Sequence, residues 1–180
     1  MRRVSSRKRD DEARPTDVSP EKIREQTFQR AAKLLAAKPR SIAELRERLL
    51  EGRRSNKEVV ETVIARLREY GYLDDDRFAA GYAQWKVKQR PIGRRRLERD
   101  LTLRKVERKV AEQALDEVFA ETPEAYLIDQ AIEKRTRIRG VPANRAEAKS
   151  LFDHLLRQGF PFELVSDKVR AIARTDLDED

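Results

Sequence analysis

Residues 41–67 read SIAELRERLLEGRRSNKEVVETVIARL, and the spacing of their apolar side chains predicts the architecture. Leu45 and Leu49 are four residues apart, and Val59, Val63 and Leu67 resume the same interval ten residues later. Because an α-helix turns once every 3.6 residues, each set lies on one face of a helix. The stretch therefore predicts a short helix followed by a longer one, packed through these five residues.

The same apolar spacing returns twice further along the chain. The third copy keeps it unchanged, whereas the second copy is one residue shorter in the connection. The matching positions are Leu97, Leu101, Val110, Ala114 and Val118 in the second copy, and Leu151, Leu155, Val165, Val169 and Ala173 in the third. A repeat of about 50 residues is too small to bury a core alone, so we expect neighbouring copies to stack.

Helix capping signals give the boundaries of these elements. Serine–glutamate capping boxes are predicted at Ser41 with Glu44 and at Ser55 with Glu58, and the run 74–76 (DDD) is expected to begin another helix. No alternating strand pattern is present, so the chain is predicted to be all-α with nine helices. We expect three tandem three-helix repeats, forming an elongated, curved array, at residues 19–73, 74–121 and 122–174. A disordered basic and polar tail is expected at 1–18, and an acidic tail at 175–180.

Composition excludes several classes of function. The 180 residues contain no Cys and one His, which removes thiolate sites and His-pair metal sites. No phosphate-binding glycine loop or nucleophile motif occurs, and no segment approaches the roughly 18 apolar residues of a membrane span. We therefore expect a cytoplasmic protein that is not an enzyme, carries no cofactor or metal and has no membrane partner. His154 is expected to have a packing or surface role.

The apolar and aromatic residues of the predicted helix after residue 74 have two interpretations. Phe78, Tyr82 and Trp85 are spaced as one helix face, which favours a core stripe, although aromatic rings at such spacing can also stack on nucleic-acid bases. The core interpretation is the one we prefer for this stripe.

Positive charge is concentrated in the middle of the chain. The formal net charge is +8, and residues 86–109 hold 11 basic and 3 acidic side chains. Such a cluster suits either a nucleic-acid backbone or an acidic protein groove, because Arg binds phosphate and carboxylate alike. Residues 120–180 carry a net −2 and are expected to face protein. The candidate binding residues are Lys86, Lys88, Arg90, Arg94, Arg95, Arg96, Arg99, Arg104, Lys105 and Arg108.

The string GYLDDDRFAAGYAQ, residues 71–84, resembles the signature of the RecX regulatory proteins of bacteria. The segments LLAAKPRSIAELRERLLEG and RPIGRRRLERDL are also similar to that family. The resemblance implies tandem three-helix repeats and a non-enzymatic protein that binds the RecA recombinase filament on single-stranded DNA. It further implies inhibition of the recombinase, ATPase and co-protease activities of RecA. Family members often have a glycine after the second unit's short helix, where this chain reads Leu103-Arg104-Lys105-Val106, so we expect a tighter or right-handed turn there.

Two other functions remain open at this point. The basic units could act as a free-standing, helix-turn-helix-like DNA-binding protein, or the array could be an adaptor with protein partners only. Partner dependence separates the three, because they require RecA filaments, DNA alone, or neither. We expect a monomer in each case.

Overall fold

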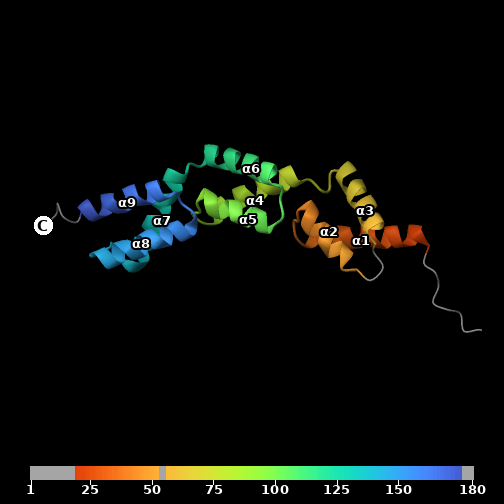
Figure 1. The fold of residues 1–180 in the computed structure, drawn as a ribbon, viewed down its shortest axis with the longest axis horizontal. Helices are drawn as coiled ribbons and strands as arrows, with labels where there is room; N and C mark the ends of the chain where they lie inside the picture. Colours follow the sequence, from red (N-terminus) through yellow and green to blue (C-terminus); the bar gives the residue numbers. More distant parts are fainter. Residues whose placement is uncertain (1–18, 53–55, 176–180) are drawn as a thin grey trace, which may run out of the picture.

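The computed structural model describes residues 19–52 and 56–175, and within these ranges it consists of nine helices and no strands. Figure 1 shows them as an elongated, curved array, which confirms the predicted all-α fold. We refer to α1–α3, α4–α6 and α7–α9 as units 1, 2 and 3. The helices are α1 (Pro20–Ala37), α2 (Ile42–Leu50), α3 (Lys57–Glu69), α4 (Asp75–Gln89), α5 (Arg94–Leu103), α6 (Arg108–Glu121), α7 (Glu124–Arg139), α8 (Arg145–Gln158) and α9 (Phe162–Thr175).

Some predictions fall on residues outside the described ranges. These are the tail at 1–18, most of the tail at 175–180, the cap at Ser55 and the side chain of Ala173.

The helix starts agree with the capping signals at two places and differ at one. Ser41 and Glu44 form the predicted capping box before α2, and Asp74 caps α4 by accepting the Arg77 N–H at 3.0 Å. The predicted box of Ser55 with Glu58 involves a residue outside the described ranges, and the structure gives α3 a different cap one residue later. Its N-cap is Asn56, whose side-chain oxygen accepts the Val59 N–H at 2.9 Å. Asn and Ser are about equally good caps, so the sequence alone did not separate them.

The buried faces follow the predicted spacing, with a shift of one residue at the start of α3 and of α6 but not of α9, where Val165 is buried as predicted. In α3, Val60 and Ile64 are buried and Val59 is only half-buried; in α6, Ala111 replaces Val110 in the same way. Both longer helices therefore bury a stripe wider than a single i, i+4 row, as expected for a helix packed against two neighbours.

The buried apolar residues form two separate cores rather than one. Unit 1 has its own cluster, which includes Leu45, Leu49 and Leu67. Units 2 and 3 share a larger cluster that runs from Ala79 on α4 to Val169 on α9. Stacking therefore joins units 2 and 3 through a common core, whereas unit 1 is joined to unit 2 in another way.

Polar contacts make the joint between units 1 and 2. The Ser41 hydroxyl donates to the Arg104 carbonyl at 2.6 Å, and the Ile42 N–H donates to the Asp75 carboxylate at 2.8 Å. Arg104 also pairs with Glu44 at 3.0 Å, with both side chains mostly buried. The start of α2 is thus held by the end of α5 and the start of α4.

Close backbone packing makes the joint between units 2 and 3. The Gly93 N–H donates to the Gln158 carbonyl at 3.0 Å, and the Arg95 N–H donates to the Gly159 carbonyl at 3.2 Å. Gly93 is the N-cap of α5 and has no side chain to cap the helix, so Glu124 of α7 accepts the Arg94 N–H at 2.7 Å instead.

The turn after α5 corrects a prediction. Lys105 has a φ of +58°, in the left-handed region, so the turn is not right-handed as we expected. Gly71 after α3 and Gly159 after α8 occupy the corresponding positions with φ of +69° and +93°. At all three places the next N–H returns to a carbonyl five residues earlier, such as Val106 to Leu101 at 3.2 Å. Lys105 therefore makes, at a steric cost, the turn that glycine makes elsewhere in the array.

Candidate polyanion-binding pocket

The structure distributes the ten predicted binding residues over several surfaces. Six of them contact other side chains of the protein, five across different helices and one, Arg108, within α6. The contacts are Lys86 with Asp100, Arg94 with Asp116, Arg96 with Gln158, Arg104 with Glu44, Lys105 with Glu47 and Arg108 with Glu112. Three of these, at Arg96, Arg104 and Lys105, join different units. Much of the predicted cluster therefore has structural contacts, which lowers the charge available to a ligand.

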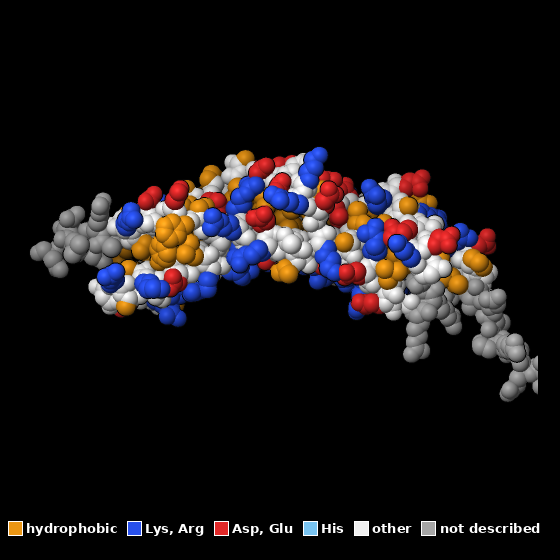
Figure 2. Space-filling model, in the orientation of Figure 1, with side chains coloured by type: hydrophobic (Ala, Val, Ile, Leu, Met, Phe, Trp, Pro, Cys, Tyr) orange, Lys and Arg blue, Asp and Glu red, His pale blue; other side chains and the backbone are white. Residues whose placement is uncertain are grey.

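The other four predicted residues are exposed and, within the described residues, form no ion pair. They are Lys88, Arg90, Arg95 and Arg99. Arg95 and Arg99 face solvent as predicted from the position of Leu97 and Leu101, and the Arg99 Nε donates to the Arg95 carbonyl at 3.3 Å. Figure 2 shows Lys and Arg side chains over all three units, with acidic side chains interspersed.

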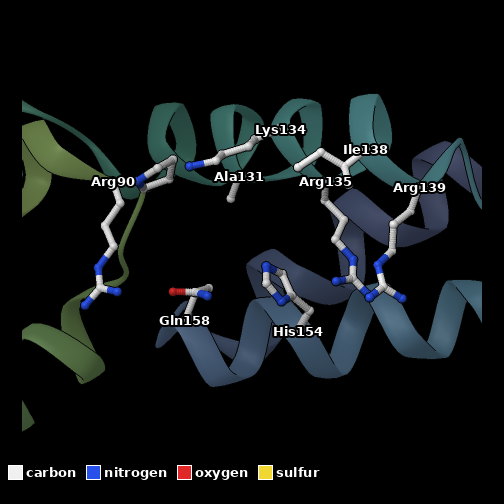
Figure 3. Close-up of a pocket in the computed structure, with 9 residues that line it drawn as sticks. Arg90, Ala131, Lys134, Arg135, Ile138, Arg139, His154 and Gln158 are labelled. Carbon is white, nitrogen blue, oxygen red and sulfur yellow. The ribbon is translucent and has the colours of Figure 1, made fainter.

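One pocket is lined by several cationic side chains and by no acidic side chain. It has a volume of about 300 Å³ and lies where the end of α4 meets α7 and α8. Figure 3 shows Arg135 and Arg139 extending side by side from α7 toward α8, while His154 and Gln158 project from α8. Arg90 enters from the end of α4, and Lys134 completes the lining charges. We call this the cationic pocket.

The electrostatics of the cationic pocket indicate charge that is not neutralised. Within the described residues, none of its four Lys and Arg side chains forms an ion pair; Arg135 donates instead to the Ser150 hydroxyl at 3.2 Å. Burial, followed by the charges of Arg139 and Arg157, lowers the pKa of Arg135. Burial and then the charges of Arg135, Arg157, Arg139 and Arg96 lower the pKa of His154. A bound anion would relieve this repulsion among the cations.

The geometry suits the binding of an anion. Guanidinium groups hold phosphate or carboxylate oxygens through paired N–H donors. In the described part of the chain, no three acidic or imidazole side chains gather as a metal site requires. No helix there is long and apolar enough to cross a bilayer.

Of the residues that line the cationic pocket, only Arg90 was predicted from the sequence to contact a ligand. The others were missed because the net charge of −2 over residues 120–180 was used to predict the partner of the whole segment. The local signal was present: residues 134–139 read KRTRIR, with four cations in six positions. Three of them, at i, i+1 and i+5, reach the same pocket next to His154.

The aromatic stripe of α4 is a core stripe only in part, since Phe78 and Tyr82 pack against the core and Trp85 does not. The buried face of α4 is formed by Ala79, Ala83 and Val87, and Trp85 is 53% exposed. Phe78 and Tyr82 are half-buried. The prediction of a core role is therefore wrong for Trp85, because small residues allow α4 to pack closely on α6 and turn the larger rings outward.

The fold and the pocket together define a helical-repeat protein with polar and cationic surfaces, and comparison with known proteins gives its family. The second three-helix domain of RecX matches residues 74–115. A regulatory protein RecX of Halorhodospira halophila is 34% identical over 151 residues, which is 83% of this chain and 87% of that protein. One of Treponema pallidum (strain Nichols) is 39% identical over 107 residues, 59% of this chain and 65% of the relative. The chain belongs to the RecX family of regulatory proteins.

Solved structures agree with the fold. The crystal structure of RecX from Lactobacillus salivarius superposes with a TM-score of 0.74 and covers 85% of this chain and 98% of that one. A second regulatory protein RecX gives a TM-score of 0.67 over 81% of this chain. At 15% and 18% identity these two structures establish the fold and not the site.

Proposed function

We propose that this protein binds the RecA recombinase filament on single-stranded DNA and inhibits its recombinase, ATPase and co-protease activities. Membership in a family of regulatory proteins named RecX carries the proposal. The protein acts in the cytoplasm by occupying a surface of the filament and performs no chemistry of its own. Inhibition results from contacts that oppose rearrangement or growth of the filament.

The cationic pocket is the part of the proposed interface that contacts DNA phosphate. Arg90, Arg135 and Arg139 reach it from two units that share one core, so its geometry does not depend on a flexible joint. Arg95 and Arg99, exposed on α5, add two cations without an ion pair in the described residues. Charge of this kind supplies affinity that does not depend on base sequence, as a filament-wide regulator requires.

The test is a titration of RecA that turns over ATP on single-stranded DNA. Substoichiometric protein should slow the turnover, and the protein alone should show neither ATPase nor nuclease activity. Unchanged turnover and filament length up to equimolar protein would exclude the proposal.

A variant of the cationic pocket tests the DNA contact separately. Arg139→Ala should weaken binding to single-stranded DNA and reduce the log–log salt slope by roughly 0.7 for each phosphate that the variant no longer neutralises. Arg137→Ala is the matched control, because Arg137 is exposed on the same helix and does not line the pocket. Equal salt slopes for the two variants would show that the pocket does not bind phosphate. Binding to free DNA that persists without any effect on RecA would favour the free-standing DNA-binding alternative.

A further inference from the structure

A second cavity lies between units 1 and 2, on the exposed aromatic face of α4. It is an open groove of about 780 Å³, more than twice the volume of the cationic pocket. Phe78, Tyr82 and Trp85 of α4 line it, together with Tyr72 and Leu35 from outside that helix. We call it the aromatic groove, and the contacts described above give it no role.

Two rings of the aromatic groove, Trp85 and Tyr72, present accessible faces, whereas Phe78 and Tyr82 are half-buried and pack against the core. The Lys86 Nζ lies 5.2 Å from the centroid of Tyr82 and 5.8 Å from that of Trp85, so each of these two rings has a cation on one side. Trp85 is 53% exposed and Tyr72 is 67% exposed, large fractions for such side chains. The ring centroids of Phe78 and Tyr82 are 6.0 Å apart, and those of Tyr82 and Trp85 are 6.2 Å apart, so the three follow each other along the helix. The exposed rings of Trp85 and Tyr72 give the groove surfaces on which flat rings can stack.

Gly81 keeps this surface open. It lies inside α4, where glycine costs about 1 kcal/mol of helix stability relative to alanine. A Cβ at Gly81 would meet nothing within 4 Å, so no packing contact requires the glycine. Its lack of a side chain leaves the groove open between Phe78 and Trp85. This is a local cost to stability that a ligand in the groove would explain.

The charge at the edge of the groove is positive and largely not neutralised. Lys38, Arg40 and Arg77 line it and, within the described residues, form no ion pair. Backbone carbonyls orient the two arginines: Arg40 donates to Leu34 at 3.4 Å, and Arg77 donates to Gly71 at 2.5 Å. The one acid of the lining, Asp74, is engaged as the N-cap of α4. An anionic ligand is therefore favoured.

Flat rings next to uncompensated cations are the chemistry of sites for unpaired nucleotides, in which bases stack on aromatic side chains and phosphates meet the cations. We infer that the aromatic groove binds the unpaired bases of single-stranded DNA. The inference rests on the proposed function for its ligand and extends it with a contact to bases in addition to phosphates. Duplex DNA keeps its bases stacked on each other, so the groove discriminates against it.

Trp85 is the only Trp of the chain, so its fluorescence reports the groove directly. The experiment titrates the full protein with oligo-dT of about 15 nucleotides, near the upper site size of single-strand binders. An abasic oligonucleotide of equal length and charge is the control ligand. Quenching by oligo-dT and not by the abasic strand is expected. Equal responses to both strands, or no response at saturation, would overturn the inference.

Two variants test the groove without relying on fluorescence of the native protein. Trp85→Ala should weaken binding of labelled oligo-dT roughly tenfold, in the range measured for one stacked base, and should leave binding of the abasic strand unchanged. Gly81→Leu should fill the groove while preserving the helix, and should weaken binding to a similar extent. Tyr126→Ala is the matched control, because Tyr126 is 58% exposed on α7, outside the groove.

The outcomes separate this inference from the proposed function. If oligo-dT quenches Trp85 but RecA turnover is unaffected, the groove binds bases and the regulatory function fails. If RecA is inhibited while Trp85→Ala and Gly81→Leu keep full affinity for oligo-dT, the inference fails and the regulatory function stands. Quenching by an acidic aromatic peptide, with no response to oligo-dT, would also overturn the inference and assign the groove to a protein partner.

Discussion

Gly93 and Gly159 lie so close across the joint between units 2 and 3 that neither has room for a side chain. A Cβ at Gly93 would lie 2.3 Å from the Gly159 carbonyl carbon, and a Cβ at Gly159 would lie 2.4 Å from the Arg96 backbone nitrogen. The neighbouring atoms are backbone and cannot rotate away. This contact holds together the two units that frame the cationic pocket.

Gly93→Ala should therefore lower the free energy of unfolding by about 3 kcal/mol, at the upper end of overpacking costs. Its φ of −84° is allowed for alanine, so the expected decrease is due to steric overlap alone. Urea denaturation followed by circular dichroism measures it. Gly81→Ala is the control and should gain about 1 kcal/mol, because a Cβ there meets nothing within 4 Å. Similar stabilities for the two variants would show that the joint is looser than described.

Lys105→Gly should stabilise the protein relative to Lys105→Ala by about 1 kcal/mol. Both variants remove the ion pair with Glu47, and only alanine keeps the steric cost of a left-handed residue at φ +58°. Thermal unfolding of the two variants side by side measures this difference. An alanine variant as stable as the glycine variant would contradict the left-handed turn.

Lys86→Ala should cost about 1–3 kcal/mol of stability, because it leaves the Asp100 carboxylate without its cation. The Lys86 Nζ lies 3.0 Å from Asp100, and both side chains are largely buried. Lys88→Ala, two residues along the same helix and exposed, should change stability by less than about 0.5 kcal/mol. Chemical denaturation measures the free energy of unfolding of the two variants. Equal losses of stability would show that the contact of Lys86 with Asp100 contributes no more than an exposed surface charge.

DNA binding should strengthen as the pH falls from 7.5 to 5.5, and His154→Gln should remove most of this dependence. In the free protein, burial and the cations Arg135, Arg157, Arg139 and Arg96 lower the pKa of His154. A phosphate bound in the cationic pocket favours the protonated ring, so binding takes up a proton. Fluorescence anisotropy of labelled oligo-dT at several pH values tests this, with the wild type as reference.

The same pKa shift predicts that the stability of the free protein falls as the pH falls, whereas DNA binding strengthens. A lowered pKa in the folded state means that the unfolded chain binds more protons, so stability is greatest above the unfolded pKa of about 6.5 and falls at lower pH. His154→Gln should flatten this part of the stability profile in the absence of DNA. A stability that rises with acidification through His154 would contradict the assignment.

Replacing Arg95 and Arg99 together by Ala should change stability by no more than about 0.5 kcal/mol each and preserve helix content. Both residues are exposed on α5, opposite the buried Leu97 and Leu101. If they contact phosphates, binding to free DNA and to filaments weakens and its salt dependence flattens. If they contact acidic RecA side chains, only binding to filaments weakens. Unchanged affinity for both targets would show that Arg95 and Arg99 are solvated surface residues with no role in binding.

The helices could be predicted from the sequence because their signals are local. Capping residues, glycines after helix ends and the 3.6-residue spacing all act within a few positions, and they predicted nine helices and most buried residues. The one-residue shifts at Val60 and Ala111 depend on which neighbours a helix packs against, which local spacing does not contain. The left-handed Lys105 was missed because lysine, unlike glycine, gives no local signal for a positive φ.

The candidate site was predicted less well, because its charges pair across units. Arg104 with Glu44 and Lys105 with Glu47 are about 60 residues apart, so a count of charges along the chain treats them as free. Conversely, the segment containing Arg135 and Arg139 lies in a region of net negative charge and still forms a pocket lined by no acid. Only the folded arrangement shows which cations remain available.

The hydrogen-bonded joint between units 1 and 2 has a mechanical consequence. Because no buried apolar core is shared across it, bending of the array is concentrated there, whereas units 2 and 3 move as one body. We expect rotation of unit 1 about the hydrogen bonds of Ser41 and Asp75 to change the curvature of the array without repacking either core. The aromatic groove spans the same joint, so its width changes with that curvature. A strand held between Tyr72 and Trp85 would then stiffen the array at its most compliant point.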